Sequence, residues 1–215
     1  IQNLKQDKNS IIVISMIIGS LLEDKKTEKR ISITPETAKK YIDQGFKVIL
    51  PKNYGEHLGL KDKAFLDSGV KIYDEENEIL EKSDIILQLG LVSDDNCLKL
   101  KENQIFIGSL NPYNNEDKIK QLTKRKIKVF SLELLPRITR AQSMDILSSQ
   151  ANLAGYKAVI ESFANFEKAI PMMMTAAGTV PAAKVLVVGA GVAGLQAIAT
   201  AKRMGAIVFA TDVRM

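Results

Sequence analysis

Apolar and polar residues alternate in blocks along residues 16–132 of this chain. Short apolar runs predict buried strands, and longer segments with an apolar residue every three or four positions predict amphipathic helices. Because the blocks alternate and their connections are short, the pattern predicts a parallel α/β domain. The predicted strands are 17–22, 47–50, 70–73, 84–89, 104–109 and 128–132, and the predicted helices are 34–44, 61–68, 75–82, 98–101 and 115–124.

The first apolar run, residues 11–22, follows Lys5 and Lys8 and therefore begins like a signal peptide. It is far too short to span a bilayer, and it ends in charged residues without a cleavage-site pattern. We interpret it as a buried strand, and we predict no direct membrane span. Residues 1–15 are then a leader or upstream extension, with Met16 as a candidate start.

A further strand–helix–strand block, residues 184–212, contains the spacing G-x-G-x-x-G at Gly189, Gly191 and Gly194. The first glycine permits a tight turn, the second leaves room for a pyrophosphate, and the third lets the helix lie close to the strand. Backbone N–H groups at the start of that helix face the phosphates. The block therefore predicts a dinucleotide site.

An acidic residue, Asp212, ends the second strand of this block. A carboxylate at this place can accept hydrogen bonds from the adenosine ribose hydroxyls, whereas it would repel the 2′-phosphate of NADP. The sequence therefore favours NAD, although Arg214 would soften the preference.

A polar segment, residues 136–149, directly follows the strand at 128–132 and reads P-R-I-T-R-A-Q-S-M-D-I-L-S-S. It lies at a carboxyl end of the predicted sheet, where α/β proteins keep their sites. We predict a helix over 145–166 next, and then a Met- and Thr-rich connector over 171–181.

The predicted fold class is α/β, with two Rossmann-like parallel-sheet domains separated by a cleft. Residues 16–150 form the N-terminal α/β domain, which carries the polar segment, and residues 151–215 form the first half of a Rossmann domain. Because a complete dinucleotide fold needs two such halves, we expect a C-terminally truncated fragment with an incomplete second domain.

Composition narrows the function classes. Hydrophobic residues make up 46% of the chain, which is ample for a core, and the net charge of +5 comes mostly from dispersed lysines. With few aromatics and no basic–aromatic motif, we expect no nucleic-acid binding. The single cysteine, Cys97, and the single histidine, His57, give no basis for a disulfide or a metal cluster.

Residues 136–159 together with 172–206 closely resemble the alpha subunit of proton-translocating NAD(P) transhydrogenases, in the alanine dehydrogenase/transhydrogenase family. The resemblance is to the NAD(H)-binding component, often called domain I, and covers residues 16–215. It implies direct hydride transfer between NAD(H) here and NADP(H) on a partner component. It also implies a membrane partner that couples transfer to proton translocation, a homodimer of this component, and a cytoplasmic place on the inner membrane through partner subunits.

The same resemblance assigns roles to residues. Arg137, Asp145 and Ser148 hold the nicotinamide end, and Gln142 reaches toward the NADP-carrying partner. These four are the predicted catalytic residues. The predicted cofactor-binding residues are Gly189, Gly191, Val192, Gly194, Asp212, Val213 and Arg214.

The chemistry of these residues agrees with that role. Hydride transfer needs two nicotinamide C4 atoms roughly 3–3.5 Å apart, and it needs neither a metal nor an acid–base pair. Amide, guanidinium and carboxylate groups suit the binding of a carboxamide and a ribose. Arg137 with Asp145 could instead be a structural ion pair at a helix start.

Two alternatives stay open. Alanine dehydrogenase, an amino-acid oxidoreductase, shares the fold, and Arg30 matches its carboxylate-binding arginine. However, Gln88 stands near its expected lysine, and its histidine after the strand at 104–109 is missing. The other alternative is a non-catalytic NAD-binding fragment that binds NADH weakly or not at all, because truncation would expose apolar surface and a sheet edge.

Overall fold

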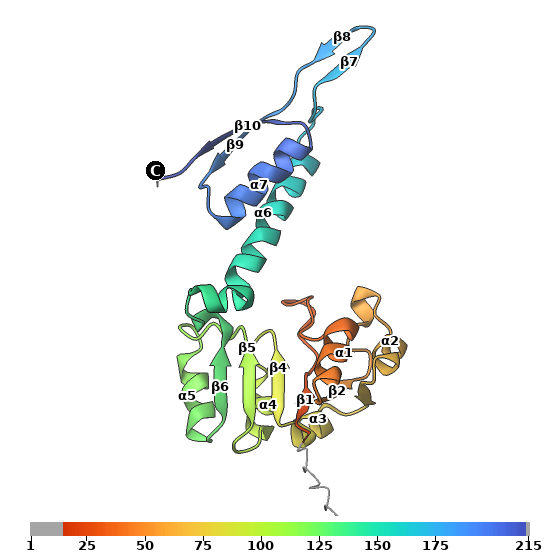
Figure 1. The fold of residues 1–215 in the computed structure, drawn as a ribbon, viewed down its shortest axis with the longest axis vertical. Helices are drawn as coiled ribbons and strands as arrows, with labels where there is room; N and C mark the ends of the chain where they lie inside the picture. The colour runs from red at the N-terminus through yellow and green to blue at the C-terminus, as the bar shows by residue number, and fades with distance from the viewer. Residues whose placement is uncertain (1–14, 214–215) are drawn as a thin grey trace, which may run out of the picture. The chain divides into compact units, whose positions relative to one another are not determined.

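The computed structural model describes residues 15–213, and Arg214 therefore lies outside the described residues. The chain divides into two compact units, with the division between Leu134 and Leu135. Each is described by itself, with the element labels of Figure 1. The boundary expected from the sequence followed residue 150. The observed division places the whole polar segment, 136–149, in the second unit.

The first unit contains a six-stranded, fully parallel sheet in the order β3-β2-β1-β4-β5-β6. The strand order reverses between β1 and β4, which is the switch point where doubly wound sheets bind ligands. The predicted parallel α/β architecture is confirmed. The strands are β1 (Ile17–Gly19), β2 (Lys47–Pro51), β3 (Lys71–Tyr73), β4 (Ile85–Gln88), β5 (Ile105–Gly108) and β6 (Lys128–Ser131).

Helices cover this sheet because successive strand residues point to opposite faces. In β2, Val48 and Leu50 join one buried cluster and Ile49 joins the other. The first cluster includes Phe65 of α2, and the second includes Leu122 of α5. The helices of the unit are α1 (Pro35–Asp43), α2 (Asp62–Asp67), α3 (Glu76–Lys82), α4 (Asp94–Lys99) and α5 (Glu116–Lys124), with 3₁₀ turns at Glu56–Leu58 and Leu132–Leu134.

The second unit begins with a 3₁₀ helix, Thr139–Met144, and the long helix α6 (Ile146–Ala164). The strand β9 (Lys184–Val188), the helix α7 (Val192–Arg203) and the strand β10 (Ile207–Thr211) follow, and the two strands pair in parallel. The predicted strand–helix–strand unit is therefore confirmed. Figure 1 shows α6 and α7 side by side.

One face of the β9–β10 ribbon is covered and the other is exposed. Val187 points toward α7, since its side chain lies near Gly194. Alternate residues point the opposite way: Val188 is 77% exposed, and Leu186 and Phe209 are also exposed. The described part of the second unit thus presents an apolar sheet face.

Two predicted elements were wrong in detail. The helix expected over 98–101 spans Asp94–Lys99 instead, because the Ser93 side chain caps it by accepting from the Asn96 N–H, 3.3 Å away. The connector 171–181 contains an antiparallel hairpin, β7 (Met173–Thr175) with β8 (Gly178–Val180). Thr175 Oγ1 closes its turn by donating to the carbonyl of Gly178 at 3.0 Å.

Candidate functional site

The glycine turn after β9 has the geometry that its residues predict. Gly189 has a φ of +94°, a conformation that L residues rarely adopt, and its N–H donates to the carbonyl of Thr211 at 2.7 Å. A β-carbon on Gly194 would lie 1.8 Å from the carbonyl oxygen of Gly189. Gly191 is the N-cap residue of α7. The turn thus brings the start of α7 against the end of β9, with its first N–H groups at the helix end.

Asp212 lies beside this turn. Its Oδ2 atom accepts a hydrogen bond from the N–H of Ala190 at 2.6 Å, so the carboxylate is held at the glycine turn. The sequence pattern placed the acid near the ribose but contained no sign of this backbone contact. Val213 is fully exposed at the end of the described chain.

The start of α6 gathers the polar segment. Asp145 is the N-cap residue: its carboxylate accepts from the backbone N–H of Ser148 at 3.0 Å and from the Ser148 hydroxyl at 2.7 Å. These hydrogen bonds, backbone first, lower the pKa of Asp145, and the positive charge of Arg137 adds to them. Within residues 15–213, Arg137 forms no direct ion pair with Asp145, so the structural ion pair considered above is not formed.

A cavity of about 550 Å³ in the second unit joins the two motifs. This volume lies within the range of small-molecule sites, roughly 300–1,000 Å³. Arg137 and Ser148 share it with the glycine turn, whereas Gln142 is exposed on its 3₁₀ helix and does not line it. The lining residues are Arg137, Leu147, Ser148, Ala151, Val188, Gly189, Gly191, Val192, Ala193 and Gly194.

Sequence reasoning missed three of these residues. Leu147 and Ala151 of α6 and Ala193 of α7 give the cavity apolar walls between its polar ends. Ala151 follows Ser148 by one helical turn, so helical periodicity could have identified it.

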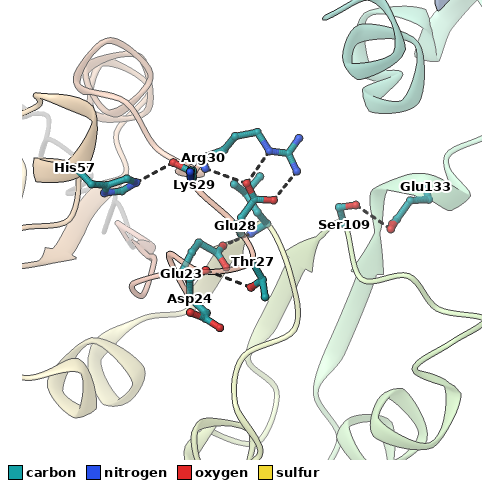
Figure 2. A network of polar contacts seen from close by, with 10 residues as sticks. Glu23, Asp24, Thr27, Glu28, Lys29, Arg30, His57, Ser109 and Glu133 are labelled. Atoms are coloured by element: carbon teal, nitrogen blue, oxygen red, sulfur yellow. Dashed lines mark hydrogen bonds and ion pairs between the residues drawn. The ribbon is translucent and has the colours of Figure 1, made fainter. Parts of the chain in front are cut away.

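The first unit holds a second polar cavity, of about 840 Å³, at its β1/β4 switch point. Its main cation, Arg30, is held by Glu28, with Nε and Nη2 at 2.9 Å and 2.6 Å from the two carboxylate oxygens (Figure 2). Gln88 is buried, and its amide accepts from the N–H of Leu21 and donates to its carbonyl. The groups at the positions considered for alanine dehydrogenase chemistry are thus bound to their own neighbours.

Figure 2 also shows the contacts of His57 and Ser109. His57 is exposed, and its Nε2 lies 2.8 Å from the carbonyl oxygen of Lys29. Ser109, at the end of β5, donates to Glu133 at 2.9 Å. Neither arrangement resembles an acid–base site.

Glu133 accepts several hydrogen bonds at the carboxyl ends of β5 and β6. Burial acts to raise its pKa, but the Ser131 hydroxyl, the Asn111 N–H and the Ser109 hydroxyl outweigh it, so that the pKa falls to about 2. No local sequence signal marks this cluster, because its donors come from two separate loops.

Within residues 15–213, no helix is both long and apolar enough to cross a bilayer. Across the same described range, no group of three or more His, Cys, Asp or Glu side chains is arranged to hold a metal ion.

The glycine turn, the acid beside it and the parallel α/β frame define a nucleotide-binding protein with a Rossmann-like fold. Sequence profiles of the family "Alanine dehydrogenase/PNT" match this chain, the N-terminal domain over residues 19–154 and the C-terminal domain over residues 158–215. The chain therefore belongs to this family.

Individual relatives agree with the predicted resemblance. The chain is 48% identical over 197 residues to the first of the chains that make up NAD(P) transhydrogenase subunit alpha in Rhodospirillum rubrum, a match that covers 89% of this chain and 51% of the relative. It is 27% identical over 201 residues to an alanine dehydrogenase of Methanococcus maripaludis, covering 92% of this chain and 53% of that protein. The chain thus spans about half the length of the curated relatives it matches.

Solved structures also match the fold. The crystal structure of transhydrogenase from Sinorhizobium meliloti superimposes with a TM-score of 0.87 at 44% identity, covering 92% of this chain and 59% of that one. The predicted family and fold class are confirmed.

Proposed function

We propose that this chain supplies the NAD(H)-binding component of a proton-translocating transhydrogenase. The observation that carries the proposal is the cavity of the second unit, which joins Arg137 and Ser148 to the glycine turn. A dinucleotide has two polar ends separated by a ribose and pyrophosphate, and this cavity has polar groups at two places with apolar walls between them.

The residues present fit such a cofactor. Gly189, Gly191 and Gly194 leave the turn without side chains, and the start of α7 favours the negative charge of a pyrophosphate. Asp212 lies where it would bind ribose hydroxyls and disfavour a 2′-phosphate, which supports NAD over NADP. Nicotinamide cofactors supply a hydride donor or acceptor at ring C4.

The roles of this chain's residues follow from their chemistry. Arg137 and Ser148 offer donors for a carboxamide and a ribose, and Asp145 holds the Ser148 hydroxyl in place. Gln142 is exposed, as a residue that contacts a partner component would be. No residue has to exchange a proton, because hydride transfer needs positioning rather than acid–base chemistry.

Several finer parts of the proposal rest on the family. They are an NADP(H)-carrying partner component, a membrane domain that couples transfer to proton translocation, a homodimer of this component, and attachment to the cytoplasmic side of the inner membrane through partners. The greater identity to a transhydrogenase subunit than to an alanine dehydrogenase, 48% against 27%, favours this function over amino-acid oxidation.

The direct test mixes the full-length gene product with the NADP(H)-binding component of a transhydrogenase. Absorbance then follows hydride transfer from NADPH to an acetylpyridine analogue of NAD. We expect transfer that depends on both components. NADH oxidation that requires pyruvate and ammonia, and not the partner component, would contradict the proposal and support alanine dehydrogenase chemistry.

A second test concerns residues 1–215 alone. We expect that this polypeptide binds NADH weakly or not at all, whereas the full-length product binds it, because an apolar face of the β9–β10 ribbon is exposed in the described chain. Fluorescence titration with NADH compares the two proteins. Equal, tight binding by both would show that this expectation is wrong.

A further inference from the structure

The two helices that border the nucleotide cavity contact each other through their backbones. At the crossing, α6 presents Gly155, which is buried, to the carbonyl group of Ala193 at the start of α7. A β-carbon on Gly155 would lie 2.0 Å from the Ala193 oxygen and 2.8 Å from its carbonyl carbon. Both atoms belong to the backbone of a helix, so no flexible side chain could move aside.

The contact continues a stack that begins in the glycine turn. Gly194 lies against the carbonyl of Gly189, and Gly155 lies against the adjacent residue, Ala193, from another helix. The two glycines therefore bring β9, α7 and α6 together in sequence. Glycine is the least favourable residue in a helix interior apart from proline, so its presence in the middle of α6 calls for a reason such as this contact.

α6 and α7 each carry one half of the proposed site. Ser148 lies in the first turn of α6, and Gly191 caps α7. The distance between these two helix ends thus depends on how closely the helices approach at Gly155. Asn152, one turn before Gly155, strengthens the same crossing through a hydrogen bond to Gln196 of α7 at 3.3 Å.

We propose that Gly155 is a positioning residue for NAD(H), a fourth glycine of the dinucleotide site that sets the spacing between its nicotinamide and pyrophosphate ends. This inference rests on the proposed function. An added methyl group must separate α6 from α7 by about 1 Å, and a misplacement of that size can lower a positioned transfer roughly 100-fold. A ligand that occupies only one end of the cavity would not sense the change.

The test measures dissociation constants for NADH and for 5′-AMP by calorimetry, using the full-length gene product. 5′-AMP engages only the adenosine and phosphate side, whereas NADH spans both. For Gly155→Ala we expect NADH binding to weaken about tenfold or more, while 5′-AMP binding stays within about twofold. Transfer to the NAD analogue should fall further than NADH affinity does.

The matched control is Ala158→Gly, at an exposed position of the same helix. Glycine there weakens the helix without touching the crossing, so it should lower the melting temperature and leave the ratio of the two dissociation constants unchanged. The ratio thereby separates spacing from general loss of stability.

Asn152→Ala keeps the inference testable even where Gly155→Ala does not fold. Loss of this hydrogen bond should weaken NADH about threefold and 5′-AMP not at all. Unchanged NADH binding in Asn152→Ala and Gly155→Ala, or an equal loss of both ligands, would overturn the spacing role. If the wild-type protein binds neither nucleotide, the proposed function itself is contradicted, and the inference fails with it.

Discussion

Each unit has a polar cavity at the carboxyl ends of parallel strands, and the two differ in how their polar groups are used. In the first unit, Arg30 is bound by Glu28, and Lys118 pairs with Asp94 at 2.7 Å. In the second unit, the cavity is built from a glycine turn, a helix start, Arg137 and Ser148. The charges of the larger cavity are therefore paired with its own loops, whereas the smaller one presents backbone groups to a ligand. A switch-point location alone does not identify a binding site.

The largest expected contrast comes from one methyl group placed in each cavity. Gly194→Ala would put a β-carbon 1.8 Å from the Gly189 carbonyl oxygen, so we expect NADH affinity to fall by about 100-fold or more. Gly90→Ala, in the first cavity, meets no atom within 4 Å and should change nothing. Fluorescence titration with NADH measures both. Similar affinities for the two variants would show that the glycine turn is not the binding site.

A smaller contrast concerns the two arginines. Arg137→Ala removes a charged donor from the second cavity, and we expect transfer to the NAD analogue to fall about 10- to 100-fold. Arg30→Ala removes an exposed pair with Glu28, which should leave transfer within about twofold of the wild type. Steady-state assays with the NADP(H) component test this. A greater loss from Arg30→Ala than from Arg137→Ala would reverse the assignment of the two cavities.

The smallest expected effect is on stability and belongs to the first unit. The pKa of Glu133 is about 2 in the folded protein, below its unfolded value of 4.5. Its contribution to stability is therefore complete above pH 4.5 and is lost as the pH falls toward 2. After allowance for solvent screening we expect about 1–2 kcal/mol.

Glu133→Gln should remove that part of the pH dependence of unfolding and leave NADH affinity unchanged at neutral pH. Urea denaturation at several pH values measures the first effect, and Glu81→Gln, at an exposed carboxylate of the same unit, is the control. Identical pH profiles for wild type and Glu133→Gln would contradict the role of the carboxylate.

The alternation of strands and helices and the glycine turn could be predicted from sequence because their signals are local. Apolar periodicity, the capping residue Thr34 and the proline at the next position mark α1 within a few residues. The turn at Gly189 follows likewise from the spacing of three glycines. Such features need no knowledge of what lies elsewhere in the fold.

Features that depend on distant partners could not be predicted. Glu133 gains its donors from the loop after β5, and Gly155 owes its role to a backbone carbonyl on another helix. The β7–β8 hairpin lacks the usual turn pairs such as Asn-Gly, since its central residues are Ala176 and Ala177. In each case the decisive contact is absent from the local pattern.

The central claim is that the nucleotide binds in the cavity of the second unit. Hydrogen exchange of the full-length gene product, with and without saturating NADH, tests it most directly. We predict slower exchange at residues 145–149 and 189–195 and no change at residues 88–93, which line the first cavity. Protection confined to residues 88–93, with none in the glycine turn, would contradict the account.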